Sequence, residues 1–183
     1  MSKIIKMTNI INPNLNNNNT LHIATLAGGC FWCIEGAFSQ LQGVHSATSG
    51  YMGGDSGSPS YEEVCSGKSG HAEVVQLSFD PTIITYQQIL EIFFTLHDPT
   101  QLNRQGNDIG SQYRSAIFYH DEAQQSMASN IIKEMVDAKM FDQNIVTRVS
   151  AAETFYSGED YHQDYFNNNP ENQYCQAVVS PKL

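Results

Sequence analysis

Residues 21–43, LHIATLAGGCFWCIEGAFSQLQG, decide the fold of this chain. Leu21–Ala27 is a short, almost continuous apolar run, which is typical of a buried strand, and two glycines end it. Cys30–Gln42 then places its apolar residues at helical spacing, and Gly43 is a typical helix stop. The stretch therefore predicts a strand that passes through a glycine turn directly into a helix.

The rest of the chain continues this alternation of strands and helices. We expect strands at 44–49, 71–79, 114–119 and 145–150, helices at 85–96, 121–139 and 159–168, a helical turn at 61–66, and irregular stretches at 50–60 and 97–112. The first six elements follow the split β-α-β order of ferredoxin-like proteins. The predicted fold is an α+β, two-layer α/β sandwich with a mainly antiparallel sheet and a long irregular C-terminal tail.

Composition and charge narrow the possible classes of function. Six asparagines lie between residues 12 and 19. Such a tract buries too little apolar surface to order itself, so we expect a disordered tail over 1–19 and a single domain over 20–183. Nineteen acidic against nine basic residues, a net charge of −10, argue against nucleic acid, since phosphate binding depends on Lys and Arg.

No apolar run in the sequence has the length of a membrane-spanning helix, and no secretory signal is recognisable at the N-terminus. We therefore expect a cytoplasmic monomer that does not associate with membranes. Four cysteines are too few for a disulfide scaffold and are better explained as thiols, ligands or redox groups.

Cys30 is the strongest chemical feature of the sequence. It opens the predicted helix, where free N–H groups and the helix macrodipole favour the thiolate, which is the nucleophilic form. The neighbouring Phe31 and Trp32 either pack in the core or wall an apolar pocket over the sulfur. Cys33 completes a C-x-x-C pair, which on a β-α unit is typical of redox sites. Because the other two cysteines form no second close pair, we expect no metal, and no other cofactor is indicated.

Glu73 shares one face of the 71–79 strand with Val75, Leu77 and Phe79. Two interpretations stay open: an exposed carboxylate at the strand end, or a buried carboxyl whose pKa is raised so that it can donate a proton. The polar stretch 103–114 is either a binding loop or an ordinary surface loop. A further aromatic cluster, expected mostly to pack, contains Tyr156, Tyr161, His162, Tyr165 and Tyr174.

An ordered series of short motifs runs through the chain. The motifs are GCFW (29–32) with Glu35, YEEVCSG (61–67), GHAE (70–73), HDPT (97–100), the 104–114 loop with SAIF (115–118), EDYHQ (159–163) and Asn169-Pro170. Together they cover about residues 21–175 and resemble the signature of the A-type peptide methionine sulfoxide reductases. An ordered series of this kind is far more specific than a single tetrapeptide.

The resemblance implies thiol-dependent reduction of methionine S-sulfoxide, in oxidised proteins or peptides and in the free amino acid, to methionine. It implies that Cys30 is the nucleophile and that Phe31 and Trp32 hold the sulfoxide methyl group. Glu73 is implied as the donor to the sulfoxide oxygen. Further implied groups are the donors Tyr61 and Tyr113, and Asp108, which would help to hold either the substrate or the tyrosine network.

The resemblance also implies how the enzyme is recycled. Cys30 is left as a sulfenic acid, a second thiol converts it into an intramolecular disulfide, and thioredoxin reduces that disulfide. Cys175 follows Asn169-Pro170 by a short spacer, as the resolving cysteine of the family often does, and is the preferred resolving thiol. Cys33, where many members carry Gly, is the alternative, because it lies within disulfide reach of Cys30 on a helical turn.

Three further expectations complete the sequence-based picture. Direct reduction of the sulfenic acid, without a resolving thiol, is a third route. Cys65 is expected to be a buried structural thiol. The rival functions are a general C-x-x-C thiol-disulfide oxidoreductase, which leaves Glu73 and the 104–114 motif unexplained, and a catalytically inactive binding module, against which the intact Cys30 and Glu73 argue.

Overall fold

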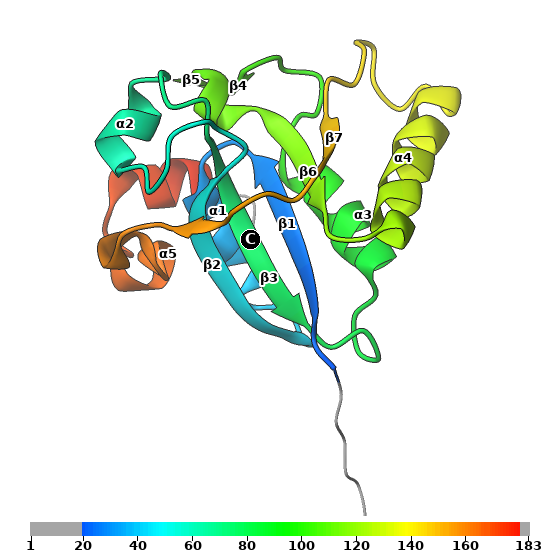
Figure 1. Ribbon diagram of the computed structural model, residues 1–183, viewed down its shortest axis with the longest axis horizontal. Helices are drawn as coiled ribbons and strands as arrows, with labels where there is room; N and C mark the ends of the chain where they lie inside the picture. The colour runs from blue at the N-terminus through cyan, green and yellow to red at the C-terminus, as the bar shows by residue number, and fades with distance from the viewer. Residues whose placement is uncertain (1–19, 180–183) are drawn as a thin grey trace, which may run out of the picture.

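A six-stranded sheet with helices on one face forms the centre of the computed structural model, which describes residues 20–179 (Figure 1). The tail expected over 1–19 lies outside the described residues. The elements, with η for a short helix that is not an α-helix, are β1 His22–Gly28, α1 Phe31–Phe38, β2 Val44–Met52, α2 Tyr61–Cys65, β3 Ala72–Phe79, α3 Tyr86–Leu96, β4 Arg104–Gln105, β5 Asp108–Ile109, η1 Ser111–Tyr113, β6 Ser115–Tyr119, α4 Glu122–Asp137, β7 Arg148–Ala151, β8 Tyr156–Ser157, η2 Asp160–His162, α5 Tyr165–Asn168 and η3 Cys175–Val179.

The strand order confirms the predicted ferredoxin-like core. The order is β7-β6-β1-β3-β2-β8, so β3 lies between β1 and β2, the two strands that α1 connects. Every pairing in the sheet is antiparallel except that of β6 with β7. In the described part of the chain, no helix is long and apolar enough to cross a membrane.

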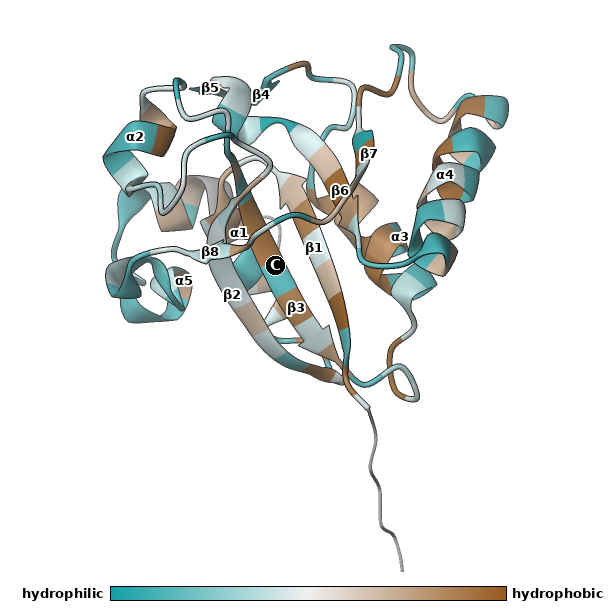
Figure 2. Cartoon of the chain, viewed as in Figure 1, coloured by the Kyte–Doolittle hydropathy of each residue, from teal (hydrophilic) through white to brown (hydrophobic). Residues whose placement is uncertain are grey.

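Burial on both faces explains why the central strands read as apolar runs rather than as alternating patterns. On one face, α1 and α3 cover a core that includes Leu26, Leu77 and Phe93. On the other face, the segment between β7 and β8 crosses the sheet and covers Val74 and Phe118 (Figure 1). Figure 2 shows the result: β1, β3 and α3 are largely hydrophobic, whereas α2 and α5 are mostly hydrophilic.

Local capping sets the start of the helices. The predicted cap Asp121 is confirmed, since its Oδ1 accepts the Gln124 N–H of α4 at 2.8 Å. Reciprocal capping boxes begin α2, through Ser60 and Glu63, and α3, through Thr85 and Gln88.

The strand expected over 145–150 covers Arg148–Ala151, and β2 extends to Met52, into the stretch expected to be irregular. Three further expectations differ from the structure. The helix expected over 30–42 ends at Phe38. The helix expected over 159–168 is broken into η2 and α5, because Asp164 adopts the left-handed conformation with φ 51°. The stretch 97–112, expected to be irregular, contains the β4–β5 hairpin, whose two-residue strands are too short to produce a periodic pattern.

Candidate active site

The Gly28-Gly29 turn places Cys30 at the junction of β1 and α1. Gly29 has φ +93°, and a Cβ there would lie 2.7 Å from Cγ of Gln105, so a side chain would collide with the β4–β5 hairpin. Cys30 is the N-cap of α1, with φ −58° and ψ 126°, and its carbonyl accepts the Cys33 N–H at 3.1 Å. The thiol therefore lies just outside the helix, one residue after the glycine that the hairpin covers.

The Cys30 thiol is buried, with 8% of the residue exposed. Burial raises the pKa of Cys30 well above its ordinary value, and a hydrogen bond with Cys33 and the charge of Glu73 raise it further, whereas Tyr174 lowers it. The expectation that the helix N-terminus keeps Cys30 as a thiolate was wrong. Loss of water around the sulfur outweighs the macrodipole, so the resting site holds a neutral thiol.

Glu73 is buried, which decides between the two interpretations of its sequence position. It is 2% exposed and its Oε2 accepts the Phe31 N–H at 3.0 Å. Burial raises the pKa of Glu73 to about 8, against the opposing effect of the Phe31 hydrogen bond, and the charges of Asp108 and Cys33 add to the increase. At neutral pH the carboxyl is therefore mostly protonated and can donate a proton next to Cys30.

Tyr61, the first residue of α2, and Tyr113, the last residue of η1, are the two further candidate donors. Burial raises the pKa of both phenols, and the charge of Glu73 contributes to both increases. They therefore remain neutral hydrogen-bond donors. Cys65 differs from expectation: it is only half-buried and hydrogen-bonds with Tyr61, so it is not an inert core thiol.

An aromatic wall surrounds the half-buried Trp32. The Tyr165 ring stacks on the indole, with centroids 3.7 Å apart, and the Tyr174 ring meets it edge-on at 5.8 Å. The indole Nε1 donates to Nδ1 of His162 at 3.2 Å, and the His162 ring lies 5.0 Å from Phe31. Phe31 is 1% exposed and belongs to the core cluster, and Trp32 packs against that cluster, so both rings pack in the core and their part in a methyl pocket stays a prediction.

The sequence analysis missed the residues that hold this wall. Glu159 accepts the Tyr51 hydroxyl and the Tyr61 N–H, each at 2.8 Å. His162 is 1% exposed and was expected only to pack. The EDYHQ motif was the available signal, but its contacts run to residues about a hundred positions earlier, which no local pattern reveals.

The C-terminal segment packs into the site. Cys175 is fully buried and lies in the same core cluster as Cys30 and Cys33. The Tyr174 hydroxyl donates to Oδ2 of Asp108 at 2.7 Å and also contacts the Cys30 thiol. Direct contacts thus connect Glu73 with Phe31, Trp32 with Tyr174 and Tyr174 with Asp108 around the start of α1, and Cys175 shares the core cluster of Cys30.

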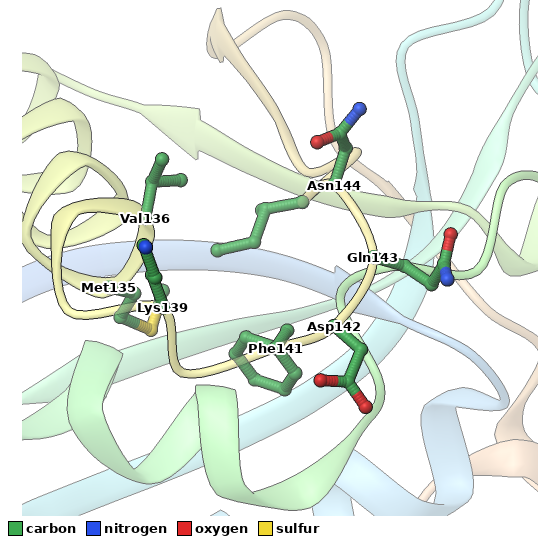
Figure 3. Close-up of a pocket in the computed structure, with 8 residues that line it drawn as sticks. Met135, Val136, Lys139, Phe141, Asp142, Gln143 and Asn144 are labelled. Atoms are coloured by element: carbon green, nitrogen blue, oxygen red, sulfur yellow. The ribbon is translucent and has the colours of Figure 1, made fainter.

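The site is distinct from a cavity of about 380 Å³ at the C-terminal end of α4 (Figure 3). Met135, Val136, Lys139 and Phe141 contribute to its lining, together with residues 142–145, and no cysteine does. Among the residues the structure describes, no group of three or more His, Cys, Asp or Glu side chains is arranged to hold a metal ion.

Comparison with known proteins gives one consistent result. The profile of the family described as peptide methionine sulfoxide reductase matches residues 22–183. The chain is 56% identical over 160 residues to the peptide methionine sulfoxide reductase MsrA of Chromobacterium violaceum, covering 87% of this chain and 91% of that protein. It is 54% identical over 160 residues to the MsrA of Natronomonas pharaonis, with coverages of 87% and 90%.

Solved structures agree with the sequence relatives. Mxr1 of Saccharomyces cerevisiae in its reduced form is similar with a TM-score of 0.79 and 36% identity, over 85% of this chain and 89% of Mxr1. Mxr1 in complex with Trx2 is similar with a TM-score of 0.56 and 25% identity, over 79% of this chain and 84% of Mxr1.

Proposed function

The chain belongs to the peptide methionine sulfoxide reductase family, and from this premise we propose how its residues carry out thiol-dependent reduction of methionine S-sulfoxide. The observation that carries the proposal is the pairing of two buried, neutral groups, the Cys30 thiol and the Glu73 carboxyl. A nucleophile and a proton donor beside an aromatic surface are the groups that this reaction requires.

In the proposed first step, the Cys30 sulfur attacks the sulfoxide sulfur while Glu73 protonates the sulfoxide oxygen. The thiol proton replaces the proton that Glu73 has given up. The sulfur–oxygen bond of the substrate breaks, oxygen passes to Cys30 as a sulfenic acid, and methionine leaves as the thioether. Atoms and electrons balance within the two reactants, so no cofactor is required.

The remaining groups orient the sulfoxide. Phe31 and Trp32 take the methyl group, since they follow Cys30 directly and their ring centroids lie 6.2 Å apart. Tyr61 and Tyr113 donate hydrogen bonds to the oxygen as neutral phenols. Asp108 fixes the substrate, which requires that it exchange its hydrogen bond from the Tyr174 hydroxyl for one from the substrate. This exchange links substrate entry to the position of the C-terminal segment.

Recycling uses Cys175 and a thioredoxin. The sulfenic acid is converted into a disulfide that involves Cys175, and thioredoxin reduces it by thiol–disulfide exchange. The burial of Cys175 in the same core cluster as Cys30 supports the first part, and the relative Mxr1, solved in complex with the thioredoxin Trx2, supports the second. The protein acts as a cytoplasmic monomer on oxidised proteins and peptides, since reduced thiols persist where thioredoxin is active.

Separated epimers of methionine sulfoxide test the proposal. The protein should reduce the S epimer, free and within a peptide, and leave the R epimer unchanged, which serves as the control. Cys30→Ser should abolish the reaction, because an alcohol is a far weaker nucleophile than a thiol that gives up its proton as it attacks. Reduction of insulin disulfides without sulfoxide turnover would instead establish the general C-x-x-C oxidoreductase.

A further inference from the structure

Three thiols of this chain, those of Cys30, Cys33 and Cys175, lie together in one buried cluster. Only the first is needed for oxygen transfer. We propose that Cys33 is a relay thiol, which first forms a disulfide with Cys30 and then passes the oxidation to Cys175, so that Cys30 is freed before any external reductant acts. The inference rests on the proposed function and specifies how its disulfide forms.

The position of Cys33 on α1 supports the first transfer. Cys30 is the N-cap with non-helical ψ, whereas Cys33 lies on the first turn and donates its N–H to the Cys30 carbonyl at 3.1 Å. Side chains three residues apart on a helical turn are about 5–6 Å apart at Cβ, and the two thiols already hydrogen-bond each other. A disulfide between them therefore requires rotation of the two side chains and leaves α1 intact.

The packing of η3 supports the second transfer. Cys175 is the first residue of η3, which packs against α1, and it is 0% exposed. Cys175 lies close enough to Cys33 for a thiolate at Cys33 to raise the pKa of Cys175. Tyr174 is fixed against Trp32 and Asp108, which holds the neighbouring Cys175 over α1. Cys33 is the one thiol within α1, so it is the thiol of that helix that is available to Cys175.

Each step balances. The Cys30 sulfenic acid and the Cys33 thiol condense to the Cys30–Cys33 disulfide, and the hydroxyl leaves as water with the Cys33 proton. The Cys175 sulfur then attacks the Cys33 sulfur, the Cys33–Cys175 bond forms, and the Cys30–Cys33 bond breaks. Cys30 leaves as a thiolate and takes up the proton released by Cys175, so one disulfide is exchanged for another without an added oxidant.

Glu73 is placed to carry the proton of the first condensation. Its Oε2 accepts the Phe31 N–H at 3.0 Å, which places the carboxyl at the first turn of α1, and the charge of Cys33 adds to the increase of its pKa. After oxygen transfer Glu73 is protonated again, so the carboxyl can give its proton to the leaving hydroxyl and take up the Cys33 proton in its place. Glu73 then transfers the proton in both chemical steps, because in each step a thiol loses a proton and an oxygen bound to sulfur gains one.

The relay predicts a stoichiometry that can be measured without reductant. Because the hand-over frees Cys30, the wild-type protein should release about two methionines per chain, and the second turnover should leave a Cys30 sulfenic acid that dimedone traps. Cys33→Ser and Cys175→Ser should each release about one. Cys65→Ser, which removes the one thiol outside the cluster, should still release about two.

Trapping and disulfide mapping distinguish the relay from direct resolution by Cys175. With one equivalent of sulfoxide, peptide mapping of the wild-type protein should find a Cys33–Cys175 disulfide, and Cys175→Ser should resist dimedone because Cys33 still condenses with Cys30. A Cys30–Cys175 disulfide, or full dimedone labelling of Cys175→Ser, would overturn the relay. The double variant Cys33→Ser/Cys175→Ser should release one methionine and be labelled fully. If it released none, the proposed function itself would fail, and the relay with it.

Discussion

Glu73→Gln isolates the acid function of the buried carboxyl. The amide has nearly the same size as the carboxyl and can still accept the Phe31 N–H, which Glu73 accepts at 3.0 Å. It can also donate a hydrogen bond to the sulfoxide oxygen, but it cannot transfer a proton. The substitution therefore preserves the shape of the site and removes one chemical step.

The expected size of the effect follows from the environment of Glu73. With a pKa of about 8, about 90% of the carboxyl is protonated at pH 7, whereas an ordinary glutamate is only about 0.3% protonated, so burial raises the acid population about 300-fold. General acid catalysis contributes about 10²–10⁴-fold, and we expect the single-turnover rate to fall by that range. Since a raised pKa means that the acid is present below about pH 8, the wild-type rate should decrease above pH 8 and the variant rate should not.

The assay is rapid-quench measurement of methionine formed from excess enzyme and the S epimer between pH 6 and pH 10. Glu91→Gln, the same change on the exposed side of α3, is the control and should leave both rate and pH profile unchanged. The assignment would be refuted if Glu73→Gln slowed the reaction by less than about tenfold, because general acid catalysis usually contributes more than that. A variant that keeps the decrease near pH 8 would show that another group titrates there, and Tyr113 would be the next candidate.

Two further predictions test the tail and the turn. Tyr174→Phe removes the hydroxyl that lowers the pKa of Cys30, so alkylation of Cys30 by iodoacetamide at pH 8 should slow by roughly 2- to 10-fold, the value of one hydrogen bond; unchanged or faster alkylation would contradict this. Gly29→Ala should lower the free energy of unfolding by more than the roughly 1–2 kcal/mol of left-handed backbone strain, because its Cβ would also meet Gln105 at 2.7 Å. Gly106→Ala is the control: Gly106 has φ +59°, and nothing lies within 4 Å of an added Cβ, so this variant introduces the backbone strain without a collision. If urea denaturation showed equal losses of unfolding free energy for the two variants, the collision with Gln105 would be disproved.

Much of the fold followed from local patterns. The apolar run of β1, the glycine turn and the helical spacing of α1 are all encoded within some twenty residues, and the Asp121 cap is encoded within three. The hairpin β4–β5 was missed because two-residue strands have no measurable period. The break between η2 and α5 was missed because the left-handed conformation of Asp164 has no strong sequence signal.

The candidate site, too, could be predicted from the sequence only in part. Cys30 at a helix start and Glu73 on an apolar strand face were visible as sequence positions, but whether the carboxyl was buried depended on what packs over β3. The protonation states reversed one expectation: the helix start favours a Cys30 thiolate, whereas burial favours the thiol. Desolvation depends on every segment that covers a group, so the pKa of Cys30 could not be read from its neighbours in sequence.

By itself, the sequence determined the chemical groups, the family and the order of strands and helices, because these depend on residue types and on spacings of a few positions. Only the tertiary structure decided that Cys175 packs in the core cluster of Cys30 and Cys33, that Tyr174 links Asp108 to Cys30, and that Glu73 is a neutral acid near pH 7. Those properties arise where α1, β3, β5 and η3 meet, and contacts between segments 40 to 140 residues apart are set by the packing of the whole core rather than by any local pattern.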